Sequence, residues 1–128
     1  MKTTSERKSA MLVGDSFFIP VGFAESLQKH GYTVVSIGSE GSEILAGARL
    51  HPQLIIVDYA MRHNDPLLAT TLLHNALPSS HIALMNGRFQ RCNQNAANSA
   101  GAEKILERTQ NASEYEALLH SLEEKGNA

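Results

Sequence analysis

The sequence predicts an α/β fold, a doubly wound five-stranded parallel sheet with five helices on its two faces. Three observations lead to this prediction. Short apolar runs recur five times along the 128 residues, and segments with helical spacing separate them. One run, Leu54–Val57, is apolar at every position, which indicates a strand buried on both faces. Because strands that alternate with helices form βαβ units, the sheet should be parallel with right-handed crossovers.

The five predicted strands are short and rich in apolar residues. They cover Ala10–Val13, Tyr32–Ile37, Leu54–Val57, Ile82–Met85 and Ala102–Leu106. Val and Ile are concentrated in the second and third runs, as expected for strands.

The five predicted helices are marked by apolar periodicity and by capping residues. They cover Ile19–His30, Ser39–Leu50, the segment from Asp65 to the residue before Pro78, Phe89–Ala100, and the segment from Ser113 onward. Asp65-Pro66 gives the third helix an N-cap and a proline in its first turn. Ser113 and Glu116 predict a capping box for the last helix. Phe89–Ala100 carries five Asn or Gln residues, so we expect a short or mobile helix there.

Composition predicts a single cytoplasmic domain. The net charge of −2 and the absence of a Lys/Arg cluster argue against direct nucleic-acid binding. One cysteine, Cys92, excludes an internal disulfide and fits a reducing compartment. No apolar stretch approaches the roughly 18 residues that span a membrane. We expect a disordered tail over residues 1–8, a domain over 9–124 and a short tail over 125–128.

Polar side chains gather where the predicted strands end. The carboxyl ends of four strands deliver Asp15, Asp58, Asn86 and Arg108, and ligands of open parallel sheets bind beyond this edge. Neighbouring carboxylates favour a cation between them, and Mg²⁺ accepts one or two carboxylates with water and phosphate. A guanidinium and an amide suit an anion on Asp58. These residues fit a phosphoryl group on or beside a carboxylate. Strand-end acids also serve only as helix caps, and for Asp58 alone both interpretations stand.

Three segments resemble the receiver domain of two-component response regulators. They are Leu54–Met61, which ends in Asp58-Tyr-Ala-Met61, then Asn64-Asp65-Pro66-Leu67, then Gly101-Ala102. The resemblance covers residues 9–124 and implies the flavodoxin-like strand order 2-1-3-4-5. It implies that Asp58 is the phosphoacceptor and that Asp15, Asp58 and the carbonyl of Ala60 hold Mg²⁺.

The predicted site departs from the family pattern at three positions. The family has two acids after its first strand, whereas this chain has one, in Gly14-Asp15 or, shifted by one residue, in Asp15-Ser16. We prefer the first alignment. Asn86 stands in place of a Thr or Ser, and Arg108 stands in place of a Lys. These departures imply weak Mg²⁺ binding and little structural response to phosphorylation.

The resemblance implies a signalling role without enzymatic turnover. The chain would be a phosphoacceptor switch of a two-component phosphorelay, with a degenerate site that receives its phosphoryl group from a histidine kinase or a phosphotransfer protein. The alternative is a pseudo-receiver, a protein-interaction module that works without phosphorylation. A small-molecule-binding flavodoxin-like domain is a third possibility. We expect no membrane association, and a homodimer would use the face of the fourth helix, fifth strand and fifth helix.

Overall fold

The centre of the structure, a computed structural model that describes residues 8–15, 19–108 and 113–126, is a parallel sheet. Its five strands lie in the order β2-β1-β3-β4-β5. The strands are β1 Lys8–Val13, β2 Tyr32–Gly38, β3 Leu54–Asp58, β4 His81–Met85 and β5 Lys104–Leu106. The predicted fold class and strand order are therefore confirmed. Lys8, expected in the N-terminal tail, is the first residue of β1.

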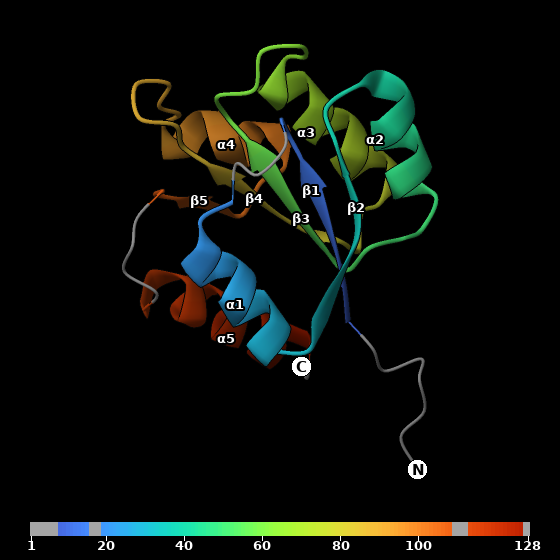
Figure 1. Cartoon of the computed structure of the whole chain (residues 1–128). Helices are drawn as coiled ribbons and strands as arrows, with labels where there is room; N and C mark the ends of the chain where they lie inside the picture. The colour runs from blue at the N-terminus through green and yellow to red at the C-terminus, as the bar shows by residue number, and fades with distance from the viewer. Residues whose placement is uncertain (1–7, 16–18, 109–112, 127–128) are drawn as a thin grey trace.

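Helices cover both faces of the sheet, as Figure 1 shows. They are α1 Val21–Lys29, α2 Gly41–Ala48, α3 Pro66–Ala76, α4 Gln94–Ala100 and α5 Ser113–Gly126. In this view α1 and α5 lie below the sheet, and α2, α3 and α4 lie above it. Across the described residues, no helix is both long and apolar enough to span a bilayer.

The helix boundaries follow local capping. The Asp65 side chain accepts from the Leu67 and Leu68 amides at 3.0 and 3.3 Å, which confirms the predicted start of α3. The fourth helix begins at Gln94, later than the predicted Phe89, because the Asn93 side chain caps it by accepting from the Ala96 amide at 2.8 Å. The fifth helix begins at Ser113, and the capping box predicted between Ser113 and Glu116 stays a prediction.

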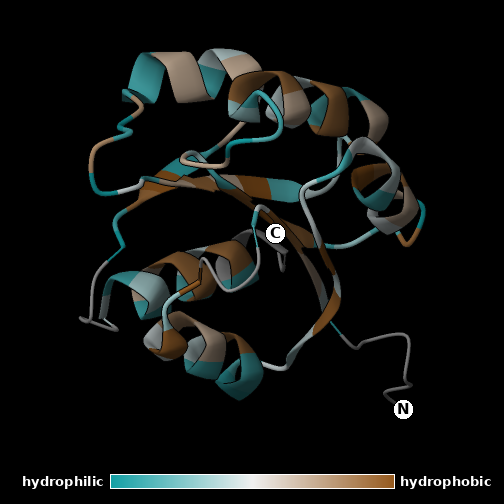
Figure 2. Ribbon diagram, turned by 45° about the horizontal axis from the view of Figure 1, so that its top comes forward, coloured by the Kyte–Doolittle hydropathy of each residue, from teal (hydrophilic) through white to brown (hydrophobic). Residues whose placement is uncertain are grey.

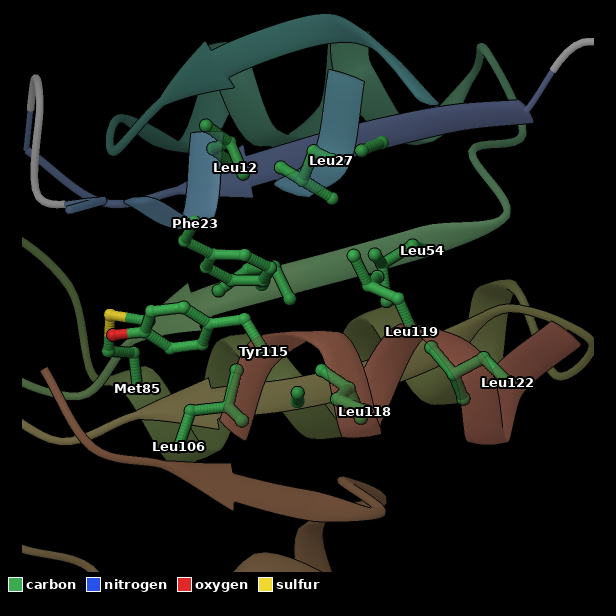
Figure 3. Close-up of a cluster of buried hydrophobic side chains, with 13 residues drawn as sticks. Leu12, Phe23, Leu27, Leu54, Met85, Leu106, Tyr115, Leu118, Leu119 and Leu122 are labelled. Carbon is green, nitrogen blue, oxygen red and sulfur yellow. The ribbon is translucent and has the colours of Figure 1, made fainter. Parts of the chain in front are cut away.

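The hydrophobic core has two parts, one on each face of the sheet. Alternate residues of β3 point to opposite faces, so Leu54 and Ile56 belong to one part while Ile55 and Val57 belong to the other. All four are at most 1% exposed, which confirms a strand buried on both faces. Figure 3 shows the part that α1 and α5 cover.

An aromatic pair joins α1 to α5 within this core. The rings of Phe23 and Tyr115 stack with their centroids 4.6 Å apart and an interplanar angle of 15°. Both side chains are fully buried. Stacked aromatic pairs add about 0.5–1.5 kcal/mol beyond the area that they bury. The pair therefore helps to set how α5 lies beneath the sheet.

Candidate functional site

Asp58 occupies the carboxyl end of β3, the central strand of the sheet. It is 4% exposed, although it is acidic. One carboxylate oxygen, Oδ1, accepts from the Ala60 amide at 2.9 Å and from Arg108 Nη2 at 3.2 Å. None of the described residues donates to the other oxygen, Oδ2. That oxygen is the one left for an incoming group.

The surroundings of Asp58 act on its charge in opposite directions. Burial raises the pKa of the Asp58 carboxyl, because it removes water from the charged form. The Ala60 amide and the positive charge of Arg108 lower this pKa, while the negative charge of Asp15 raises it again. The net shift is upward, so the fold holds Asp58 where its negative charge is only partly compensated. A bound cation would compensate the remaining negative charge of Asp58.

Arg108 reaches Asp58 from the segment that follows β5. The two residues are 50 positions apart in the sequence, and the parallel sheet brings their strand ends together. The Arg108 side chain stays 39% exposed, whereas that of Asp58 is 5% exposed. The guanidinium therefore spans from the buried carboxylate to the surface. This position lets it contact both Asp58 and an anion bound above it.

Asn86 follows β4 and is 2% exposed. Its Oδ1 accepts from the Cys92 amide at 2.8 Å, and its Nδ2 donates to Glu107 Oε2 at 3.2 Å. Both ends of the amide are thus engaged with the loop before α4 and with the end of β5. In this structure its bonds stabilise that loop and do not reach Asp58.

Glu107 links these elements, and the sequence pattern did not single it out. Its carboxylate accepts from Arg91 Nη2 at 2.7 Å as well as from Asn86. The Arg91 hydrogen bond, followed by that of Asn86, lowers the pKa of Glu107. The backbone carbonyl of Glu107 accepts from the Tyr115 hydroxyl at 2.8 Å. Its place directly before Arg108, at a strand end, is the signal that could have found it.

Asp15 lies at the end of β1, the strand beside β3. It makes no hydrogen bond or ion pair with the described residues, and its charge acts on Asp58. Within the described ranges there is no group of three or more His, Cys, Asp or Glu side chains that could hold a metal ion. Two carboxylates and one backbone carbonyl, that of Ala60, nevertheless suit Mg²⁺, which keeps several waters in protein sites. The donor set fits a largely hydrated ion.

The loops after β3 and β4 approach each other closely beside Asp58. A Cβ built on Gly87 would lie 2.6 Å from the Cβ of Ala60, so only glycine lets the loops after β3 and β4 approach this closely. The Cys92 thiol on one of these loops also acts on Tyr59 of the other, because after burial it is the next cause that raises the pKa of the Tyr59 hydroxyl. Burial raises the pKa of the Cys92 thiol, which keeps it protonated and unreactive.

No family model and no curated protein sequence matches the chain, whereas many solved structures do. The receiver domain of AraT, a response regulator from Geobacillus stearothermophilus, superimposes with a TM-score of 0.79 at 18% identity, covering 94% of this chain and 95% of that one. A CheY-like receiver domain protein from Methanospirillum hungatei gives a TM-score of 0.75 at 19% identity, covering 95% and 98%.

The chain has the receiver-domain fold. A further match, the receiver domain of RcsB from Salmonella enterica serovar Typhimurium with the phosphomimetic BeF₃⁻, gives a TM-score of 0.75 at 15% identity over 93% and 90% of the chains. Asp15, Asp58 and Arg108 follow or end β1, β3 and β5 and lie at one edge of the sheet. Asn86 lies at the same edge, although its hydrogen bonds go elsewhere.

Proposed function

We propose that this chain is a phosphoacceptor signalling module of the two-component type, with Asp58 as the acceptor. The observation that carries the proposal is a buried aspartate at the end of the central strand, with one oxygen bound to Ala60 and Arg108 and the other open. The receiver fold supports it. Its partners would be a histidine kinase or a phosphotransfer protein in the cytoplasm. A homodimer through α4, β5 and α5 belongs to the same proposal.

The chemistry assigns a role to each strand-end residue. Asp58 Oδ2 attacks the phosphorus of the donor, the bond from phosphorus to the donor's leaving atom breaks with its electron pair, and an acyl phosphate forms. Arg108 donates to the phosphoryl oxygens as negative charge develops on them. Asp15, Asp58 and the Ala60 carbonyl would hold Mg²⁺, which supplies further charge neutralisation. Phosphorylation then adds charge at a buried position; the dephosphorylated donor departs, and the phosphoryl group stays covalently bound to the chain.

The structural response to phosphorylation should be small, because the side chain of Asn86 already forms two hydrogen bonds. Its two hydrogen bonds tie the end of β4 to Cys92 and to Glu107. Turning the amide toward a phosphoryl group would break both bonds, and each buried polar group left without a partner costs about 1–3 kcal/mol. We therefore expect phosphorylation without a large movement of the loop before α4.

Phosphorylation of the purified chain tests the acceptor role. The chain is incubated with acetyl phosphate and Mg²⁺, and intact mass spectrometry measures the added phosphoryl group. We expect slow, partial modification that Asp58→Asn abolishes. Asp65→Asn is the matched control, because it makes the same change at an exposed helix cap where Asn works as well. An unmodified chain under conditions that phosphorylate a known receiver would refute the proposal.

A pseudo-receiver is the second candidate function, and one observation favours it. Arg108 and Asp58 already form an ion pair, so the site is occupied by its own side chains without a phosphoryl group. In the cell, Asp58→Asn separates the two functions. Loss of signalling supports the acceptor. Signalling that persists with Asp58→Asn but fails with substitutions on the exposed face of α5 supports docking alone.

Mg²⁺ binding should be weak. With only Asp15 and Asp58 supplying charge, we predict a dissociation constant in the millimolar range or above. An NMR titration with MgCl₂, which follows the amides of Asp15 and Asp58, measures it. Asp15→Asn should weaken binding further. Micromolar affinity would mean that additional ligands exist.

A further inference from the structure

β2 forms an edge of the sheet as the structure describes it, and its sequence lacks the charges and prolines that usually protect such edges. Its seven residues, Tyr32–Gly38, include no charged side chain. Three large apolar side chains on it reach solvent: Val34 is 39% exposed, Val35 is 39% exposed and Ile37 is 50% exposed. Natural edge strands are normally short, charged or covered, because their free backbone groups pair readily with another strand.

The opposite edge of the same sheet is protected. β5 has three residues, and its first, Lys104, is exposed. A short strand with an exposed lysine resists pairing with another chain. Of the two edge strands, only β2 is long and uncharged. The face of α4, β5 and α5 lies at the opposite edge of the sheet from β2 (Figure 1).

A β-bulge arranges the apolar side chains of β2. Ala10 pairs with Val34 and Leu12 pairs with Ile37, with a shift in register between Ala10 and Met11. Ala10 and Leu12 both face the core part beneath α1 and α5. Since paired residues point to the same face, Val34 and Ile37 share that face. In a regular strand, residues three apart would point to opposite faces.

This arrangement is self-complementary under a two-fold rotation. In an antiparallel pair of two β2 strands, Val34 of one copy can lie opposite Ile37 of the other, on the same face. The rotation axis then passes between Val35 and Ser36. Two apolar contacts form, and no like charges meet, because the strand carries none. The free backbone groups on either side of the bulge gain partners.

We propose that the chain forms a two-fold symmetric homodimer by antiparallel pairing of β2 with β2 of a second copy. The sheets of the two copies then join into one continuous sheet, and α1 and α2 of one copy lie beside α1 and α2 of the other. A second copy is the occupant that this edge fits, because the apolar pair matches its own image. The dimer leaves the rim around Asp58 open to other proteins.

Disulfide cross-linking tests the register. Val34→Cys and Ile37→Cys are made separately in a Cys92→Ser background, mixed and oxidised gently. We expect a covalent dimer from the mixture and little from either variant alone, because only residues 34 and 37 face each other. Val21→Cys, an exposed residue on α1, mixed with Ile37→Cys is the control. Equal cross-linking of every combination would overturn the proposed register.

Sedimentation velocity tests the dimer itself. The unmodified chain should show concentration-dependent association, and Val34→Lys with Ile37→Lys should remove the part that β2 supports while the circular dichroism spectrum is unchanged. Association that persists at full strength in this variant would use another face, such as that of α4, β5 and α5, and would overturn pairing through β2. Phe89→Lys, at an apolar position away from β2 that is 81% exposed, should leave the dimer intact. A chain that stays monomeric up to about 1 mM, where even weak specific pairs assemble, overturns the proposal. That result would leave the edge free for an extended segment of another protein.

Discussion

At the scale of single residues, Asp58 shows how this fold stores electrostatic free energy. Removing a carboxylate from water costs free energy unless a cation or donors compensate. Ala60 and Arg108 compensate in part, but burial has the larger effect and raises the pKa of Asp58. The folded state is therefore less stable when Asp58 is charged than it would be with a neutral side chain of the same shape.

We predict that Asp58→Asn stabilises the chain at neutral pH. A carboxyl group whose folded pKa lies above its unfolded value lowers stability as pH rises through that window, and has no effect below the unfolded pKa of about 3.9. The melting temperature of the variant should exceed that of the unmodified chain at pH 7.5. The difference should shrink as pH falls towards 4.

Thermal melts followed by circular dichroism at several pH values measure this difference. Asp65→Asn, at an exposed helix cap, is the control and should show no comparable gain. If Asp58→Asn lowers the melting temperature at pH 7.5, the Arg108 contact outweighs burial and the balance argued above is wrong.

The sequence allowed some of these residues to be predicted and not others. Asp58 stood out because a four-residue apolar run ends in it, and Arg108 because it follows the last strand. The network of Glu107 with Arg91 and Asn86 could not be predicted. Its bonds depend on side-chain conformations and on a loop whose path has no repeating pattern.

At the scale of secondary-structure elements, a histidine joins α1 to α5. His30 Nε2 lies 2.7 Å from Glu116 Oε1, and His30 Nδ1 lies 3.0 Å from Glu123 Oε2. A neutral imidazole can donate from only one nitrogen, so both contacts require the protonated ring. Lys8 Nζ also contacts Glu123, at 2.7 Å, and extends the group to β1. The cluster ties the two helices and the first strand together.

We predict that this cluster stabilises the fold only in an intermediate pH range. The hydrogen bonds to Glu116 and then Glu123 raise the pKa of His30. Stability from His30 is therefore complete below its unfolded pKa of about 6.5 and is lost as pH rises through the folded value. The pKa of Glu123 falls to about 2, led by its Lys8 bond. Its contribution is lost as pH drops from its ordinary value of about 4.3 towards 2.

The variant His30→Gln measures how the contribution of His30 to stability changes as pH rises. Its loss of melting temperature relative to the unmodified chain should be largest near pH 5–6, below the unfolded histidine pKa of about 6.5, and smaller at pH 9. His63→Gln, in an exposed loop, is the control. A loss that is constant across pH would mean that His30 acts by packing alone.

The fourth helix should exchange its backbone amides faster than the other helices. It has seven residues, and only Ala97 and Ala100 are buried. Regions with few buried apolar contacts open at low free-energy cost. Hydrogen exchange by NMR should show rapid exchange from Gln94 to Ser99. Cys92 should be slower, because its amide donates to buried Asn86. Uniform strong protection across α4 would contradict this.

At the scale of the whole molecule, the two parts of the core share one sheet, so we predict cooperative unfolding. Leu119 is fully buried, and Leu119→Ala should cost about 2–5 kcal/mol by removing contacts and leaving a cavity. Leu72→Ala makes the same change at a position that is 59% exposed. It should cost far less.

Urea titrations followed by circular dichroism and by tyrosine emission measure both variants. Domains below about 150 residues usually unfold in a single transition, so the two probes should coincide. Separate transitions would show that the two sides of the sheet unfold independently.

The arrangement of the whole fold followed from the pattern of apolar runs and helical segments. The strand order came from the resemblance, because hydrophobic periodicity does not say which strands are neighbours. The predicted start of α4 at Phe89 was wrong by five residues, since Asn93 caps a helix that begins at Gln94. The bulge in β2 could not be predicted, because a single shifted residue leaves no mark on a run of Val and Ile.

The contact between Tyr59 and Cys92 also has a spectroscopic consequence. The chain contains no tryptophan and three tyrosines, so its intrinsic emission comes from tyrosine alone. Tyr59 directly follows Asp58, and the Cys92 thiol on the neighbouring loop helps to raise the pKa of its hydroxyl. Events at Asp58 that shift this loop will alter the emission of Tyr59. The fluorescence of Tyr59 can therefore report on the neighbouring residue Asp58 without a label, and Tyr59→Phe is the control that lacks this signal.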